Sequence, residues 1–152
     1  MRKVFGVIVA LLMAASSCSK MQELTNGSNA ANVAGTWQGT VAFTGCTPAA
    51  VCAAAGFSGG SAIGIMTLTQ SGNNVNGSYT YKGAGISASV SGVVNGNNVT
   101  VDGSASNPFG TVTVHLTGTA DQNSMPSNLT HQIHLADGRS GTVTGSGDFS
   151  KQ

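Results

Sequence analysis

Apolar and polar residues alternate along many short stretches of this chain, and turn residues separate the stretches. The clearest stretch is 111–120, where Val112, Val114 and Leu116 alternate with threonines and a histidine. Strict alternation over several residues is typical of a β-strand with one buried face. The same pattern predicts eight strands, at 36–44, 64–70, 75–81, 86–94, 99–104, 111–120, 129–135 and 140–151.

Two of the expected turns share one sequence. Gly72-Asn-Asn-Val75 recurs as Gly96-Asn-Asn-Val99, 24 residues later. The repeat leaves about 12 residues for each strand with its turn, which is the spacing expected of an antiparallel meander. We therefore expect an all-β fold, an eight-stranded antiparallel up-and-down barrel with both turns at one end. A β-sandwich is the alternative, because alternation does not show whether the first and last strands pair.

The first connection, residues 45–62, is longer than the others. An alanine-rich stretch there predicts a short helix, with Thr47 as its N-cap, Pro48 at the first helical position and Gly56 as its stop. Long ordered loops are disproportionately functional. We expect this loop either to gate the barrel or to plug one open end.

The N-terminus has the features of an export signal. Arg2 and Lys3 precede an apolar run over residues 4–15, which is shorter than the roughly 20 residues of a membrane-spanning helix. Residues 1–17 are therefore predicted to be a signal peptide. The boundary Ala15-Ser-Ser-Cys18 resembles the lipobox of bacterial lipoproteins, which implies cleavage before Cys18 and its lipidation. Ordinary cleavage after a small residue is the alternative.

The three cysteines fit this interpretation. Cys46 and Cys52 are close enough in sequence to form a disulfide in an exported chain, and Cys18 is then the odd one. Residues 18–33 are polar and without period, and are predicted to tether a domain at 34–152. We expect a lipid-anchored protein of the bacterial envelope, and Ser19 after the cysteine favours the outer membrane.

Composition and motifs give no support for an enzyme. Charged residues make up only 7% of the chain and form no basic patch, so no nucleic-acid partner is expected. Neither a nucleophile elbow nor a phosphate loop nor a zinc pattern occurs, and we predict no cofactor and no metal. His131 and His134 are three residues apart and face opposite sides of a strand. His131 is predicted to point inward, and His115 and His134 outward.

The stretch Gly35-Thr36-Trp37 resembles the start of the first strand in lipocalins and the wider calycin group, and the hairpin rhythm is similar to small bacterial lipocalin-like lipoproteins. The resemblance implies an eight-stranded barrel whose floor is closed by Trp37. It also implies a basic side chain across the indole, for which Lys151 is the candidate. Trp37 is the only tryptophan, whereas the biotin site of avidins uses several, so biotin binding is not expected.

A small apolar or amphipathic ligand inside the barrel is the first hypothesis for function. Its predicted contacts are the inward aromatic, methionine and histidine residues and one loop aromatic, namely Trp37, Phe43, Phe57, Met66, Tyr79, Tyr81 and His131. Small inward residues either leave room for that ligand or ease strand curvature; these are Gly39, Gly77, Ala88, Gly92, Gly118, Ala120, Gly145 and Gly147. The alternative is a closed barrel whose threonine-rich surface binds a protein or glycan, as in an adhesin or inhibitor.

Overall fold

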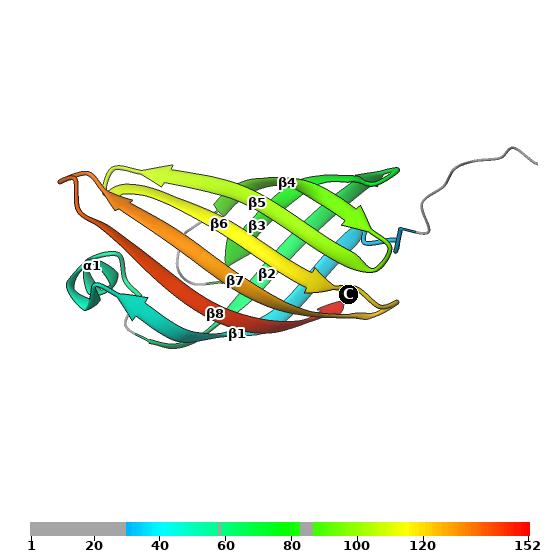
Figure 1. Ribbon diagram of the computed structural model, residues 1–152, viewed down its shortest axis with the longest axis horizontal. Helices are drawn as coiled ribbons and strands as arrows, with labels where there is room; N and C mark the ends of the chain where they lie inside the picture. The colour runs from blue at the N-terminus through cyan, green and yellow to red at the C-terminus, as the bar shows by residue number, and fades with distance from the viewer. Residues whose placement is uncertain (1–29, 58, 83–86) are drawn as a thin grey trace, which may run out of the picture.

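The chain forms one closed barrel of antiparallel strands (Figure 1). It is seen in a computed structural model that describes residues 30–57, 59–82 and 87–152. Each strand pairs with the next, and β8 pairs with β1. The elements are β1 (Gly35–Thr47), α1 (Ala49–Ala54), β2 (Gly60–Ser71), β3 (Asn74–Tyr81), β4 (Ser87–Asn95), β5 (Asn98–Asn107), β6 (Gly110–Thr119), β7 (Ser124–Leu135) and β8 (Ser140–Lys151). The predicted up-and-down barrel is confirmed, and the β1–β8 pairing excludes the sandwich.

Strand β7 differs most from its prediction, because it begins at Ser124 rather than at residue 129. Pro126, which lacks a backbone N–H, lies inside this extension. Pairing with β6 ends at Ser127, whereas pairing with β8 continues to Ser124. Pro126 therefore has a neighbouring strand on one side only, and a proline is tolerated in such an edge position.

The two repeated turns lie at the same end of the barrel, as predicted. They join β2 to β3 and β4 to β5 in an up-and-down order. The backbone carbonyl of Gly96 accepts a hydrogen bond from Ala31 N–H at 2.7 Å. The described chain thus starts beside these turns, at the end opposite α1 (Figure 1). We call the end with the turns the floor and the end with α1 the mouth.

Trp37 closes the floor from inside. Its side chain has no exposed surface, and its Nε1 donates a hydrogen bond to the carbonyl of Val33 at 2.9 Å. Lys151 lies opposite Trp37 in the β1–β8 register, with its Nζ 5.5 Å from the ring centroid. The predicted cation–π contact is confirmed. Val33, the last residue of the predicted tether, is itself buried, and its N–H donates to Gln70 Oε1 at 2.7 Å.

Several inward glycines are required where neighbouring strands approach closely. A Cβ added at Gly39, Gly77 or Gly92 would collide with a backbone carbonyl of the adjacent strand. At Gly64 and Gly147 it would instead lie about 3 Å from the ring of Phe149. At Gly39, Gly77 and Gly92 small residues permit close strand approach, in line with the predicted role in strand curvature, whereas Gly64 and Gly147 make room for the Phe149 ring. The space beside them is already occupied.

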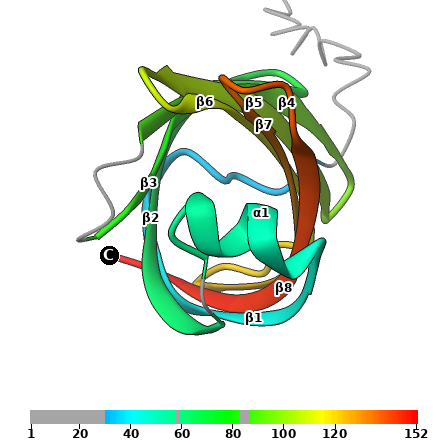
Figure 2. The ribbon, with the colours of Figure 1, turned by 90° about the vertical axis from the view of Figure 1, so that its left-hand side faces the viewer.

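The helix after β1 lies across the mouth (Figure 2). The prediction of Thr47 as its N-cap is wrong, because Thr47 is held in β1 opposite Thr142. Pro48 occupies the N-cap position, without a side-chain hydrogen bond. Gly56 stops the helix as predicted. Its φ is +81°, and the N–H of Phe57 bonds back to the carbonyl of Cys52 at 2.8 Å.

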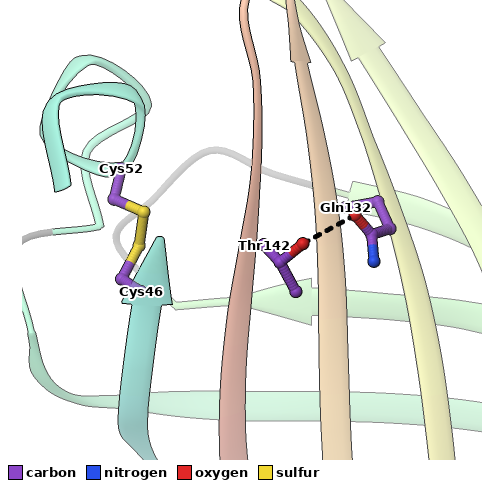
Figure 3. The surroundings of a disulfide bond; sticks show 4 residues. All are labelled: Cys46, Cys52, Gln132 and Thr142. Atoms are coloured by element: carbon purple, nitrogen blue, oxygen red, sulfur yellow. Dashed lines mark hydrogen bonds between the residues drawn. A yellow bond between two sulfur atoms is a disulfide. The ribbon is translucent and has the colours of Figure 1, made fainter. Parts of the chain in front are cut away.

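The predicted disulfide between Cys46 and Cys52 is present, and it joins the end of β1 to α1 (Figure 3). The two Cα atoms lie 6.1 Å apart. Cys52 is buried, whereas Cys46 is partly exposed. The bridge therefore holds α1 next to the strand that leads into it.

Replacing Gly77 with alanine should destabilise the barrel by about 2–3 kcal/mol, because the added methyl group meets the carbonyl of Thr67 on β2. Asn76→Ala, at an exposed position on the same strand, should change stability by less than about 0.5 kcal/mol. Urea unfolding of the two variants and the parent measures both effects. Equal midpoints for all three proteins would contradict close strand contact at Gly77.

Candidate functional site

Five side chains gather behind α1 at the mouth, and we call them the mouth cluster: Phe43, Phe57, Tyr79, Tyr81 and His131. Phe43 comes from β1, the tyrosines from β3 and His131 from β7, while Phe57 follows α1. Strands β3 and β7 are four positions apart in a ring of eight, so they face each other across the barrel. The cluster therefore spans the interior from one wall to the other.

The rings of the mouth cluster contact one another closely. Phe43 packs edge-on against Phe57 at 5.4 Å and against Tyr81 at 5.7 Å between centroids. His131 lies 5.7 Å from Phe57 and 5.6 Å from Tyr81, with both pairs of rings tilted. Offset and edge-to-face contacts at these distances are the favourable arrangements for aromatic rings. Phe57 is thus the part of the α1 segment that reaches into the cluster.

One hydrogen bond crosses the interior, between the Tyr81 hydroxyl and His131 Nε2 at 3.0 Å. Two other polar atoms in the cluster, the Tyr79 hydroxyl and His131 Nδ1, have no hydrogen-bond partner among the described residues. Tyr79 is 2% exposed and His131 is 1% exposed. Leaving a buried polar group unpaired costs about 1–3 kcal/mol. The cluster therefore contains the kind of polar group that native proteins usually satisfy with water or a ligand.

Burial keeps all three titratable side chains of the cluster uncharged near neutral pH. It raises the pKa of Tyr81 to about 12, although the nearby Tyr79 hydroxyl, which is not in hydrogen-bond geometry with it, acts in the opposite direction. It raises the pKa of Tyr79 further, and the neighbouring Tyr81 adds to that rise. It lowers the pKa of His131 to about 4. A neutral imidazole accepts or donates a hydrogen bond at each nitrogen, according to its tautomer.

The structure brings five of the seven predicted ligand contacts together in the mouth cluster. Met66 lies opposite Tyr79 on β2 and is fully buried. It is also opposite Trp37 on the other side, so it links the cluster to the floor. Trp37 itself is at the far end. Alternation predicted which residues of each strand point into the barrel. The order and direction of the strands in the closed barrel then show which of these residues lie near the mouth and which near the floor.

Sequence reasoning missed Phe149 as a neighbour of the site. Its ring lies 6.4 Å from that of Tyr79, although 70 residues separate the two in sequence (149 − 79). The alternation of β8 placed Phe149 on the inward face but gave no indication of its neighbours. Gly64 explains the contact, because it has no side chain and both the Phe149 ring and the Tyr79 hydroxyl lie against this position.

The α1 segment packs in a cluster of its own. Val51, Cys52 and Phe57 contact Ile133 and Val143 at the ends of β7 and β8. This group is separate from the main core, whose buried members each expose 5% or less of their surface. Phe43 borders both clusters. The α1 segment therefore forms a separate apolar group that meets the main core at Phe43.

The outer surface carries the other two histidines, as predicted. His115 Nδ1 lies 2.6 Å from Asp102 Oδ1, and both side chains are more than half exposed. His134 Nδ1 lies 2.9 Å from the Ser140 hydroxyl. Within the described ranges, no three His, Cys, Asp or Glu side chains converge in a way that could hold a metal ion.

A shallow groove of about 90 Å³ runs beside α1, between the β5–β6 turn and the end of β7. Phe109, in that turn, is 76% exposed. Its backbone is held in place, because its N–H donates to Asn107 Oδ1 and its carbonyl accepts from Ala136 N–H, both at 2.9 Å. The mouth therefore presents one fixed, exposed aromatic ring to the outside.

Lowering the pH should destabilise the protein through His131. Its pKa is about 4 in the folded state against 6.5 in an unfolded chain, so the unfolded chain binds more protons between these values. Stability therefore falls as the pH drops from about 6.5 to about 4, by on the order of 3 kcal/mol. Urea unfolding across this range measures the loss. His131→Phe should flatten the profile, whereas the exposed His134→Phe should keep it. Parallel profiles for all three proteins would contradict a buried neutral His131.

Comparison with protein-family models, with curated proteins and with solved structures finds no match to this chain. The fold is consistent with the calycin type, as an eight-stranded closed barrel with a tryptophan at its floor. In the part of the chain that the structure describes, no helix is long and apolar enough to cross a membrane. The predicted signal peptide, Cys18 and most of the predicted tether lie outside the described residues.

Proposed function

We propose that this protein is a lipid-anchored component of the bacterial envelope that binds a small amphipathic molecule at the mouth of its barrel. The observation that carries this proposal is the difference between the two ends. The floor is sealed by Trp37, with its own hydrogen bond and a lysine above the ring. The mouth is closed by a six-residue helix and one aromatic ring.

The mouth is the end that can open without disturbing the barrel. The α1 segment packs against β1, β7 and β8 in its own apolar group, and no barrel strand depends on it for pairing. The disulfide keeps the segment attached at Cys46 when Phe57 moves away. Removing Phe57 would uncover Phe43, Tyr81 and His131, and thus a site with apolar walls and polar groups at its base. Such a lining suits a small amphipathic ligand.

The position of the anchor agrees with this orientation. The described chain enters at the floor, where Ala31 and Val33 are hydrogen-bonded to Gly96 and Gln70. A lipid on Cys18 would therefore hold the floor toward the membrane and direct the mouth away from it. Acyl chains contribute about 0.8 kcal/mol per buried methylene, so several chains hold a small domain stably on a bilayer.

A second candidate function uses the outside of the mouth. Phe109 is 76% exposed next to the groove beside α1, and exposed aromatic rings are enriched in protein interfaces. A partner protein that docks here would cover Phe109 and leave the interior unchanged. The Phe57 and Phe109 positions therefore separate the two candidates.

Native mass spectrometry of the full-length protein, released from its own envelope in mild detergent, tests the first function. We expect a small molecule to co-purify with the parent and with Phe109→Ala, and to be lost from Phe57→Ala because the mouth no longer closes. If no molecule is found, and apolar compounds leave the NMR signals of Tyr81 and His131 unchanged, ligand binding is wrong. A protein partner that is captured by the parent but lost from Phe109→Ala would favour the second function.

Replacing Cys18 with serine tests the anchor. The variant should move from the membrane fraction to the fraction released by osmotic shock, because the acyl chains have no attachment point. The Cys46→Ser/Cys52→Ser double variant keeps the lipidation site and should stay with the membrane. Membrane association of Cys18→Ser equal to that of the parent would contradict lipidation at this residue.

A further inference from the structure

Two buried polar atoms that lack a partner in the described part of the chain indicate which part of a ligand the mouth would recognise. The Tyr79 hydroxyl and His131 Nδ1 belong to residues that are 98% and 99% buried, and both lie in the mouth cluster. They come from opposite walls of the barrel. Tyr81, between them, packs 5.0 Å from the ring of Tyr79 and bonds to the other nitrogen of His131. The three residues thus form one continuous polar strip across an apolar interior.

The hydrogen bond between Tyr81 and Nε2 determines whether Nδ1 of His131 is a hydrogen-bond donor or acceptor. A phenol is a stronger acid than a neutral imidazole, so we expect the Tyr81 hydroxyl to donate to Nε2 rather than accept from it. The hydrogen of the neutral imidazole then resides on Nδ1. Nδ1–H and the Tyr79 hydroxyl are therefore both donors, and neither has an acceptor within residues 30–57, 59–82 and 87–152. Burial keeps His131 neutral at physiological pH, which preserves this arrangement.

Charge in the interior limits the ligand further. Among the buried residues that the structure describes, none carries a formal charge at neutral pH. Lys151 lies at the floor over Trp37, and Arg139 is paired with Asp137 on the surface. A carboxylate placed against His131 would lack a counter-charge, and burying an unpaired charge is costly. An uncharged acceptor meets the two donors without this cost.

Resting on the proposed function, we propose that His131 Nδ1–H and the Tyr79 hydroxyl bind the uncharged carbonyl group of an amphipathic ester, amide or ketone. The apolar remainder of the ligand would lie against Phe43 and take the place of the Phe57 ring. Tyr81 is a positioning residue, because its hydrogen bond fixes the tautomer of His131. The mouth cluster would then distinguish a carbonyl compound from a fatty acid or an alkane of equal length.

Titration of the full chain with methyl octanoate, octanoate and octane tests the inference, with ¹⁵N-histidine NMR to follow His131. We expect methyl octanoate to bind about tenfold more tightly than the other two and to shift the Nδ1 resonance of His131. Tyr79→Phe keeps the ring and removes only the hydroxyl, so it should lower ester affinity about tenfold and leave octane binding unchanged. His134→Phe, on the outer surface, should match the parent for all three compounds.

The outcomes separate this inference from the proposed function. If octane or octanoate binds as tightly as the ester, or if Tyr79→Phe binds the ester like the parent, carbonyl recognition is wrong while ligand binding stands. If none of the three compounds binds the parent, the proposed function fails and this inference fails with it. A parent spectrum with the hydrogen on Nε2 would also overturn the inference, and this measurement needs no variant.

Discussion

The pairing of β1 with β8 is the constraint on which the rest of this structure depends. It converts a meander with two open edges into a ring, and every strand then has a neighbour on each side. Ring closure also forces the strands to tilt and curve, which brings backbones close together at Gly39, Gly77 and Gly92. These three glycines are therefore a consequence of closure. They say little about the space available to a ligand.

Closure also determines which residues meet. Trp37 and Lys151 are 114 positions apart in sequence (151 − 37), yet they lie opposite each other because they belong to the two strands that close the ring. Tyr81 and His131 meet for another reason, since β3 and β7 face each other across a narrow barrel. An eight-stranded barrel is just wide enough for long side chains from opposite walls to touch. The mouth cluster is thus a product of barrel diameter as much as of sequence.

These two kinds of contact differ in whether they could be predicted from the sequence. The period of two predicted the strands and the inward face of His131, and the Gly-Thr-Trp start predicted the floor and its lysine. Contacts across the barrel could not be predicted from the sequence. Alternation shows whether a side chain points inward or outward, but not its position along the barrel axis or the residue that it meets on the opposite wall. Phe149 against Tyr79 was missed for that reason. Thr47 was misassigned because strand pairing opposite Thr142 outweighs a local capping preference.

Buried polar groups are hydrogen-bonded at one end of the barrel and not at the other among the described residues, and this difference is the main support for the proposed binding site at the mouth. At the floor, Trp37 Nε1 donates to Val33, and the Gln70 side chain accepts from Val33 and donates to Ala31. At the mouth, Tyr79 and His131 are almost fully buried, but each keeps a polar atom that no described residue pairs with. A barrel of this size can be filled by apolar side chains alone. Keeping a histidine and a tyrosine hydroxyl in that position is a stability cost that a purely structural interior would avoid. We infer that the mouth retains them for a polar group that comes from outside the chain.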